Sequence, residues 1–376
     1  MADATTTAGL RNVVAGQSGI SSIDGQRGIL AYRGIDIHEL AEHSSFEETT
    51  YLLHYGRLPT RTELATFRQV LARQRSVPDE LLSVQRSVPR SAHPMASLRT
   101  LVSALGALDP DASDEREDAR VRKALRLIAQ MSTLVAMIER MRHGWAPVAP
   151  DASLDHAANF LYMLHGERPR PSAARAMDVA LILHADHEFN ASTFAARVAA
   201  STLADVHGAV TAALATLKGP LHGGANEAVM QMLEDVSSPE RAELWLREAF
   251  AAKRKVMGFG HAVYRTEDPR ATVLRRLSRQ IGEETGQGRW FGLSEAIEAA
   301  VRAQKGLYAN VDFYSASLYR ALGIPTDLFT PVFAVSRIAG WTAHVLEQLH
   351  NNKLIRPEAE YIGPSPMPYV PLEARG

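Results

Sequence analysis

The sequence predicts an almost entirely helical protein. Apolar residues recur at helical spacing along most of its 376 residues, whereas a convincing strand pattern occurs only once, between Gly19 and Gly34. In that stretch Asp24-Gly25 and Gly28 supply turn residues between short β-branched runs, which indicates a hairpin. We therefore expect an all-α fold with a small N-terminal β-hairpin, on a chain long enough for one large or two medium domains.

Start and stop signals place the individual helices after the hairpin. Two capping boxes, Ser45-x-x-Glu48 and Thr60-x-x-Glu63, each open a helix. The longest helix is expected over 119–142, where apolar residues follow one face. An acidic, proline-containing stretch precedes it at 109–118 and is expected to be a loop or a solvated helix start. Further helices are expected over 154–164, 172–184, 192–204, 210–217, 225–235, 239–254, 270–283, 294–305, 312–322 and 336–350.

Glycine and proline punctuation suggests how the helices divide into domains. Gly219-Pro220 and Gly323-Ile324-Pro325 flank a region that could be a lobe hinged on the remainder of the chain. We expect residues 1–222 to form a large helical domain and residues 223–323 a small mobile one. Residues 324–376 would return to the large domain and end in a C-terminal arm.

Composition excludes several classes of function. Lysine and arginine number 41 and aspartate and glutamate 42, so no strong field favours nucleic acid or a membrane surface. The absence of cysteine excludes disulfides, thiol nucleophiles and thiolate metal sites. The N-terminal residues 1–9 lack a signal-peptide pattern, and the longest apolar run, near 129–138, is too short to span a bilayer. A cytoplasmic protein is the expectation.

The segment 217–227 has the strongest local signature. Gly219 and Pro220 end one helix, Gly223 and Gly224 open the next, and His222 stands between them. Near a helix N-terminus the positive end of the dipole disfavours a charged histidine. A neutral imidazole can donate a hydrogen bond to a carbonyl that is becoming an enolate. A capping turn whose histidine only fills space is the alternative reading.

The segment 184–190 concentrates histidines and carboxylates at the end of an apolar helix. His184 and His187 stand three residues apart, and the HExxH arrangement of many zinc enzymes is absent. Without thiolates or a matching second cluster, hydrogen bonding or substrate binding is the favoured interpretation over a metal site.

A glycine-containing stretch at 255–270 brings a third histidine, His261, beside backbone that can approach a ligand closely. The third glycine and the preceding strand of a dinucleotide fingerprint are both missing, which argues against that motif. Lys255, Arg265 and Arg270 bring positive charge suited to phosphates or carboxylates. An exposed basic loop would explain the charge but not the glycines beside a histidine.

Two charged side chains occur in otherwise apolar helical patterns. Asp312 stands at a helix start, where an aspartate is usually an N-cap. Arg337 lies in the apolar run from Phe333 to Trp341, and a buried arginine requires a carboxylate from the protein or from a ligand. Arg356 near the C-terminus carries little information alone.

Taken together, these segments resemble the citrate synthase family, in the shorter form found in many bacteria and archaea. The resemblance covers nearly the whole chain in the order of the family, and no position with an assigned role departs from it. The matching segments are Ile23-Asp24-Gly25, Tyr32-Arg33-Gly34, 217–227, 258–270, 310–314, 333–344 and Arg356-Pro357.

The resemblance implies a reaction and a set of roles. It implies a two-domain helical homodimer that condenses acetyl-CoA with oxaloacetate, with no tightly bound cofactor and no metal. Arg356 would reach into the site of the partner subunit. The implied catalytic residues are His222, His261 and Asp312. The implied oxaloacetate ligands are His187, Arg270, Arg337 and Arg356. The implied coenzyme A residues are Lys255, Val256, Met257, Gly258, Phe259 and Arg265.

Two alternatives to citrate synthesis stay open from the sequence. A 2-methylcitrate synthase would use propionyl-CoA, which differs from acetyl-CoA by one methylene group in an apolar pocket. The pattern around His261 to Arg270 favours citrate synthase. A helical scaffold without catalysis would have no need for three such side chains together.

Overall fold

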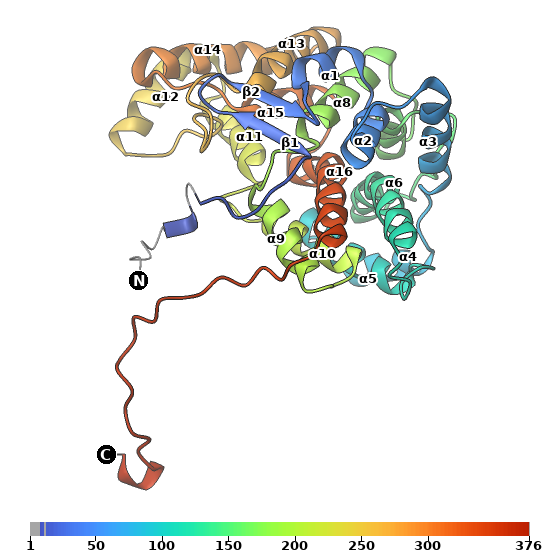
Figure 1. The fold of residues 1–376 in the computed structure, drawn as a ribbon. Helices are drawn as coiled ribbons and strands as arrows, with labels where there is room; N and C mark the ends of the chain where they lie inside the picture. Colours follow the sequence, from blue (N-terminus) through green and yellow to red (C-terminus); the bar gives the residue numbers. More distant parts are fainter. Residues whose placement is uncertain (1–7, 11–12, 376) are drawn as a thin grey trace.

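The computed structural model describes residues 8–10 and 13–375, and in that part of the chain it contains 16 α-helices and one small β-sheet (Figure 1). This confirms the expected all-α class. The helices are α1 Ile37–His43, α2 Phe46–Tyr55, α3 Arg61–Arg73, α4 Glu80–Ser87, α5 Pro94–Leu108, α6 Glu117–Arg142, α7 His156–His165, α8 Pro171–His184, α9 Ala191–Ser201, α10 Val206–Leu217, α11 Ala225–Val236, α12 Pro239–Ala251, α13 Pro269–Glu284, α14 Gly288–Lys305, α15 Val311–Ala321 and α16 Phe329–His350.

The N-terminal hairpin is present, but it is part of a three-stranded antiparallel sheet. The strands are β1 Ser21–Asp24, β2 Ile29–Tyr32 and β3 Ile35–Asp36, in the order β1-β2-β3. The sequence did not predict β3, because two residues are too few to show an alternating pattern. The hairpin turn packs closely on a later loop: a Cβ atom on Gly25 would lie 2.4 Å from the carbonyl oxygen of Val263. The sheet therefore supports the loop that carries His261.

The expected helices are present with boundaries shifted by up to seven residues, the largest shift being at the start of α16, and α1, α4 and α5 were missed. Ser45 and Thr60 cap α2 and α3 through their side chains, and the reciprocal contact of a full capping box is present in α3, between Glu63 and Thr60. The start of α5 was missed because its N-cap is His93, whose ring nitrogen accepts the N–H of Met95. Histidine is not among the residues that normally mark a helix start.

The acidic stretch 109–118 is partly buried rather than wholly solvated. Asp109 is 8% exposed and accepts two hydrogen bonds from Arg126 of α6, at 2.9 and 2.6 Å. The aspartate therefore anchors the start of the longest helix, a structural role that sequence alone did not indicate.

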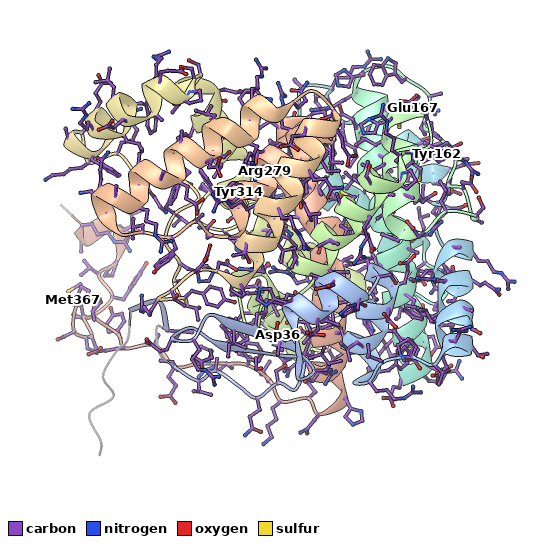
Figure 2. The ribbon with its side chains drawn as sticks, turned by 90° about the horizontal axis from the view of Figure 1, so that it is seen from above. Asp36, Tyr162, Glu167, Arg279, Tyr314 and Met367 are labelled. Carbon is purple, nitrogen blue, oxygen red and sulfur yellow. The ribbon has the colours of Figure 1, made fainter. Side chains whose placement is uncertain are left out.

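Helix α16 is the central element of the fold. It is buried along almost its whole length and packs against α6, α8, α9 and α10. The helices from α11 to α15 pack mainly on one another and form a separate group beyond the sheet (Figure 1). Arg279 and Tyr314 belong to this group, and Tyr162 and Glu167 lie at the other end of the molecule (Figure 2). Whether region 223–323 moves as a domain stays a prediction.

After α16 the chain runs away from the body as a C-terminal arm, residues 351–375 (Figure 1). Its apolar side chains are exposed: Tyr361 by 77%, Ile362 by 91% and Met367 by 76%. Among the helices described here, none combines the length and the apolar character needed to cross a bilayer.

Candidate active site

Two buried arginines, Arg270 and Arg337, form the centre of the candidate site, and each is 2% exposed. Arg270 donates from Nε and Nη2 to the two carboxylate oxygens of Asp268, at 2.9 and 2.8 Å. Asp268 also accepts the backbone N–H groups of Arg270 and Val311, at the starts of α13 and α15. One carboxylate therefore orients the arginine and joins two helix N-termini.

Arg337 of α16 has no carboxylate at ion-pair distance among the described residues. Its Nε donates to the carbonyl oxygen of His184 at 2.6 Å, and its guanidinium lies over the ring of Phe333 at 4.5 Å from the centroid. Burial lowers the pKa of Arg337 to about 10, although the charge of Asp186 opposes the shift. The sequence predicts a carboxylate for this arginine, and a ligand could supply it.

The end of α8 carries His187 and is held in place by the sheet. The hydroxyl of Tyr32 on β2 accepts the N–H of Asp186 at 3.1 Å and lies 3.0 Å from the carbonyl oxygen of that residue. His187 Nε2 lies 3.1 Å from the hydroxyl of Tyr264. Burial lowers the pKa of His187 well below its ordinary value, and the nearby positive charge of Arg270 lowers it further. His187 is therefore neutral at pH 7.

His184 and His187 make hydrogen bonds to different partners. His184 Nδ1 donates to the carbonyl oxygen of Ala180 at 2.8 Å, and burial lowers the pKa of His184 to about 3. Within the described ranges no group of three or more histidine, aspartate or glutamate side chains is arranged to hold a metal ion. The hydrogen-bonding interpretation of this segment fits the geometry.

His222 lies in the turn between α10 and α11, and Gly224 is the N-cap of α11. The ring contacts a different helix, α9. The backbone N–H of Ser192 donates to His222 Nε2 at 3.2 Å, and the Ser192 hydroxyl lies 2.8 Å from the same nitrogen. Because a backbone N–H can only donate, Nε2 is the unprotonated nitrogen and Nδ1 carries the proton. Burial lowers the pKa of His222 to about 4, so the ring is neutral at pH 7.

His261 ends a loop that two glycines shape. Gly258 and Gly260 have φ angles of +81° and +74°, in the left-handed region that favours glycine. The side-chain amide of Asn310 donates to the carbonyl oxygen of Gly260 at 2.9 Å, which ties the loop to the start of α15. His261 Nδ1 accepts the N–H of Val263 at 3.0 Å, so the proton of the neutral ring is on Nε2. Burial lowers the pKa of His261 to about 4.

Asp312 is the second residue of α15, and the N-cap interpretation of it is wrong. The cap is Asn310, whose side-chain oxygen accepts the N–H of Asp312 at 3.1 Å. Burial raises the pKa of Asp312 to about 6, and the charge of Arg270 only partly opposes the shift. The carboxyl group is therefore ionised at neutral pH and more basic than an exposed aspartate.

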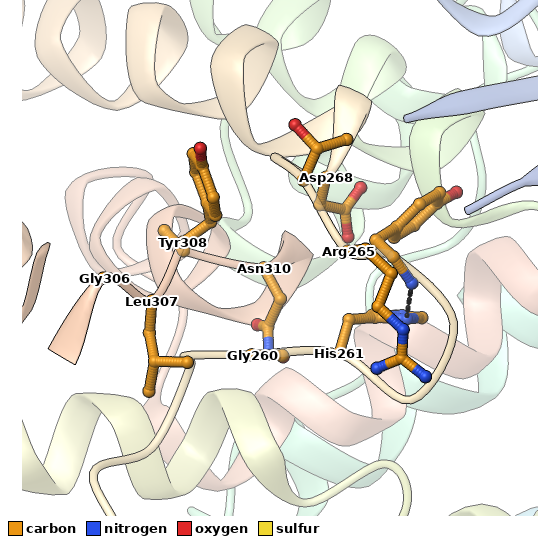
Figure 3. Close-up of a pocket in the computed structure, with 11 residues that line it drawn as sticks. Gly260, His261, Arg265, Asp268, Gly306, Leu307, Tyr308 and Asn310 are labelled. Atoms are coloured by element: carbon orange, nitrogen blue, oxygen red, sulfur yellow. Dashed lines mark hydrogen bonds between the residues drawn. The ribbon is translucent and has the colours of Figure 1, made fainter. Parts of the chain in front are cut away.

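A pocket of about 200 Å³ opens beside His261 (Figure 3). Its lining comes from the two segments 260–268 and 306–310, which the loop hydrogen bonds hold together. Figure 3 shows Arg265 and Tyr308 on opposite sides of this opening. Among the expected coenzyme A residues, Arg265 is the one in the lining.

The other expected coenzyme A residues lie outside that lining. Val256 and Phe259 are buried, and the Phe259 ring packs 4.5 Å from that of Phe313 between centroids. Lys255 is exposed and Met257 is partly buried against the core. A contact between coenzyme A and these residues or Gly258 stays a prediction.

Arg356 is not brought to the other site residues within the same chain. It is exposed on the C-terminal arm and lines a groove of about 700 Å³ with Phe189 and Phe194. It makes no hydrogen bond with His187 among the described residues. Its role from a partner subunit stays a prediction.

Sequence reasoning missed three residues that organise the site. Ser192 fixes the tautomer of His222, Asp268 orients Arg270, and Tyr264 contacts His187. The Asp268-Pro-Arg sequence is a helix-start signal, and it could have indicated that Asp268 caps α13. Nothing in the local sequence around Ser192 indicates that it faces His222.

Comparison with known proteins decides the family. The family model described as "Citrate synthase, C-terminal domain" matches residues 9–358. The chain is 50% identical to citrate synthase 2 of Bacillus subtilis over 99% of this chain and 100% of that protein. The chain belongs to the citrate synthase family. It is therefore an acyltransferase of the class that converts acyl groups into alkyl groups on transfer.

The family includes relatives with two substrate preferences. The chain is 43% identical to a 2-methylcitrate synthase of Shewanella oneidensis over 98% of both chains. Among solved structures, the chain matches citrate synthase from Thermoplasma acidophilum with a TM-score of 0.92 at 34% identity over 98% of both chains. That structure is a ternary complex with carboxymethyl coenzyme A and oxaloacetate. The citrate synthase family fold is thus established for this chain.

Proposed function

We propose that this protein is a citrate synthase, which condenses acetyl-CoA with oxaloacetate and water to give citrate and coenzyme A. The observation that carries the proposal is a pair of neutral histidines with fixed tautomers, His222 and His261, in a site with two buried arginines. The same site holds Asp312, whose pKa is raised. Coenzyme A takes part as a substrate and not as a tightly bound cofactor.

The first step is removal of a proton from the acetyl methyl group. That methyl is a very weak carbon acid, so a carboxylate can act as its base only if the oxygen charge is stabilised as it forms. Asp312, with a pKa of about 6, takes the proton. The Nδ1–H of His222 donates to the thioester oxygen, and a neutral donor of this kind stabilises the enolate without a full positive charge.

The second substrate is held and polarised by the remaining residues. Oxaloacetate carries two carboxylates, which Arg270 and Arg337 are suited to pair, with His187 beside them. The Nε2–H of His261 polarises the ketone, and the enolate carbon of acetyl-CoA attacks the ketone carbon to form the new C–C bond. His261 then protonates the resulting alkoxide. Arg356 of a second copy completes the set in a homodimer. Water then hydrolyses the citryl thioester.

The second candidate function is that of a 2-methylcitrate synthase. It is supported by relatives of that name that are 43% identical to this chain. One methylene group in an apolar pocket changes the specificity constant about 10- to 200-fold. The preference for citrate synthesis is supported by the higher identity, 50%, to a citrate synthase.

The test compares kcat/KM for coenzyme A release from acetyl-CoA and from propionyl-CoA, each with oxaloacetate. We expect acetyl-CoA to be preferred at least about tenfold. A preference for propionyl-CoA would establish the 2-methylcitrate reaction instead. If neither acyl-CoA releases coenzyme A, the alternative of a helical scaffold without catalysis is favoured instead.

A further inference from the structure

A second pocket, of about 430 Å³, lies between α3 and the loop before α7, and its lining includes none of the active-site residues. Arg68 and Arg73 of α3 line it from the exposed side. Glu47 and Arg75 also line it, and both are only 1% exposed. Buried charged side chains at a pocket are unusual unless each has a partner.

Arg75 has a free guanidinium edge. Its Nη1 donates to the carbonyl oxygens of Asp151 and Leu154, at 2.9 Å each. Its Nε is buried and has no hydrogen-bond partner, and among the described residues the hydrogen bonds of this guanidinium come from Nη1 alone. The Nε–Nη2 edge is the one that pairs with a carboxylate or phosphate through two parallel hydrogen bonds.

The carboxylates near this pocket do not fill that edge. Glu47 Oε1 accepts the backbone N–H of His156 at 2.8 Å, and its Oε2 is buried without a partner. Asp155 caps α7 by accepting the N–H of Ala158 at 2.8 Å. Three arginines face two carboxylates here, so the pocket carries a net positive charge with one unpaired acceptor.

We propose that this pocket binds a small hydroxylated organic anion. Its carboxylate or phosphate group pairs with the free edge of Arg75 and is attracted by Arg68 and Arg73. A hydroxyl group of the same ligand donates to the unpaired oxygen of Glu47. Such a ligand satisfies both buried groups at once, which an anion without a hydroxyl group, such as sulfate, does not. This inference is independent of the reaction proposed for the active site.

The test is isothermal titration calorimetry on the full chain, with oxaloacetate and carboxymethyl coenzyme A present to occupy the active site. The probes are glycerol 3-phosphate and glycerate, which offer the same hydroxyl chemistry with a phosphate or a carboxylate. We expect one binding site per chain for at least one probe, and the stronger probe identifies the anionic group.

Three variants locate the binding. Arg75→Gln should abolish it, and Arg73→Gln, at an exposed position where folding is not at risk, should weaken it about tenfold. Arg61→Gln removes the same charge at the exposed start of α3, outside the pocket, and should bind as the wild type does. No heat of binding with either probe overturns the proposal. Wild-type affinity in folded Arg73→Gln protein also overturns it.

Discussion

Hydrogen bonds to single residues fix where the protons of the two proposed catalytic histidines lie. His222 presents Nδ1–H because Ser192 donates to its other nitrogen, and His261 presents Nε2–H because Val263 does the same. Each ring is thereby a neutral donor at pH 7. The histidines themselves were identified from the sequence by family resemblance. Their tautomers could not be, because Ser192 is 30 residues from His222 along the chain.

Replacing Asp312 by asparagine should stabilise the protein above pH 6. The folded pKa of about 6 is raised above the ordinary 3.8, so the folded state binds the proton more tightly. The stability that this group contributes is present below pH 3.8 and is lost as pH rises through 6. Asp312→Asn should therefore unfold with a free energy higher than wild type by about 1–3 kcal/mol at pH 8.

The measurement is denaturant unfolding of both proteins at pH 8 and at pH 4.5. The advantage of Asp312→Asn should shrink at the lower pH, where the wild-type carboxyl is protonated in the folded state. An advantage of equal size at both values, or a variant less stable at pH 8, would show that the carboxyl is not strained by burial.

Among the structural elements, the loop 258–261 requires glycine at two positions for different reasons. A Cβ atom on Gly258 would lie 2.8 Å from side-chain atoms of Phe313 and Val229, whereas one on Gly260 meets nothing within 4 Å. Both residues have positive φ angles. The sequence showed that glycines beside His261 were significant, but not that one of them packs against α11 and α15.

The pair Gly258→Ala and Gly260→Ala separates backbone strain from packing. Both variants force a side chain into the left-handed region, at about 1–2 kcal/mol. Gly258→Ala also overpacks a buried contact and should lose at least about 1 kcal/mol more. Denaturant unfolding of the two variants gives the comparison. If both variants lose the same free energy of unfolding, the side chains next to Gly258 can move aside without destabilising the protein.

Ordinary helix-start signals made some elements predictable, although α1, which Asp36 caps, was still missed. Helices α2 and α3 begin at serine and threonine caps and were placed correctly. Helix α5 begins at His93, and β3 has two residues, so neither gave a readable pattern. The contact of Asp268 with Val311 joins residues 43 positions apart, and only the fold brings them together.

On the scale of the whole molecule, the exposed position of Arg356 suggests that one chain does not make a complete site. If Arg356 acts in the partner subunit, each site of a dimer needs Asp312 from one chain and Arg356 from the other. Refolding Asp312→Ala together with Arg356→Ala protein should then restore activity. Random pairing makes half the dimers mixed with one intact site of two, so we expect roughly a quarter of wild-type activity.

The control is each variant refolded alone, which should stay inactive. Mass spectrometry of the intact dimers confirms that mixing has occurred. If mixed dimers form and activity does not rise above that of the separate variants, Arg356 acts within its own chain or not at all.

The central claim is that Asp312 removes a proton from the acetyl methyl group. Acetyl-CoA is incubated with enzyme in D₂O and malate, whose hydroxyl replaces the ketone of oxaloacetate so that condensation cannot follow. Mass spectrometry then measures deuterium in the methyl group. Wild type and the surface control Asp235→Asn should exchange it, and Asp312→Asn should do so at least about 100-fold more slowly. Exchange by Asp312→Asn at the wild-type rate would contradict the account.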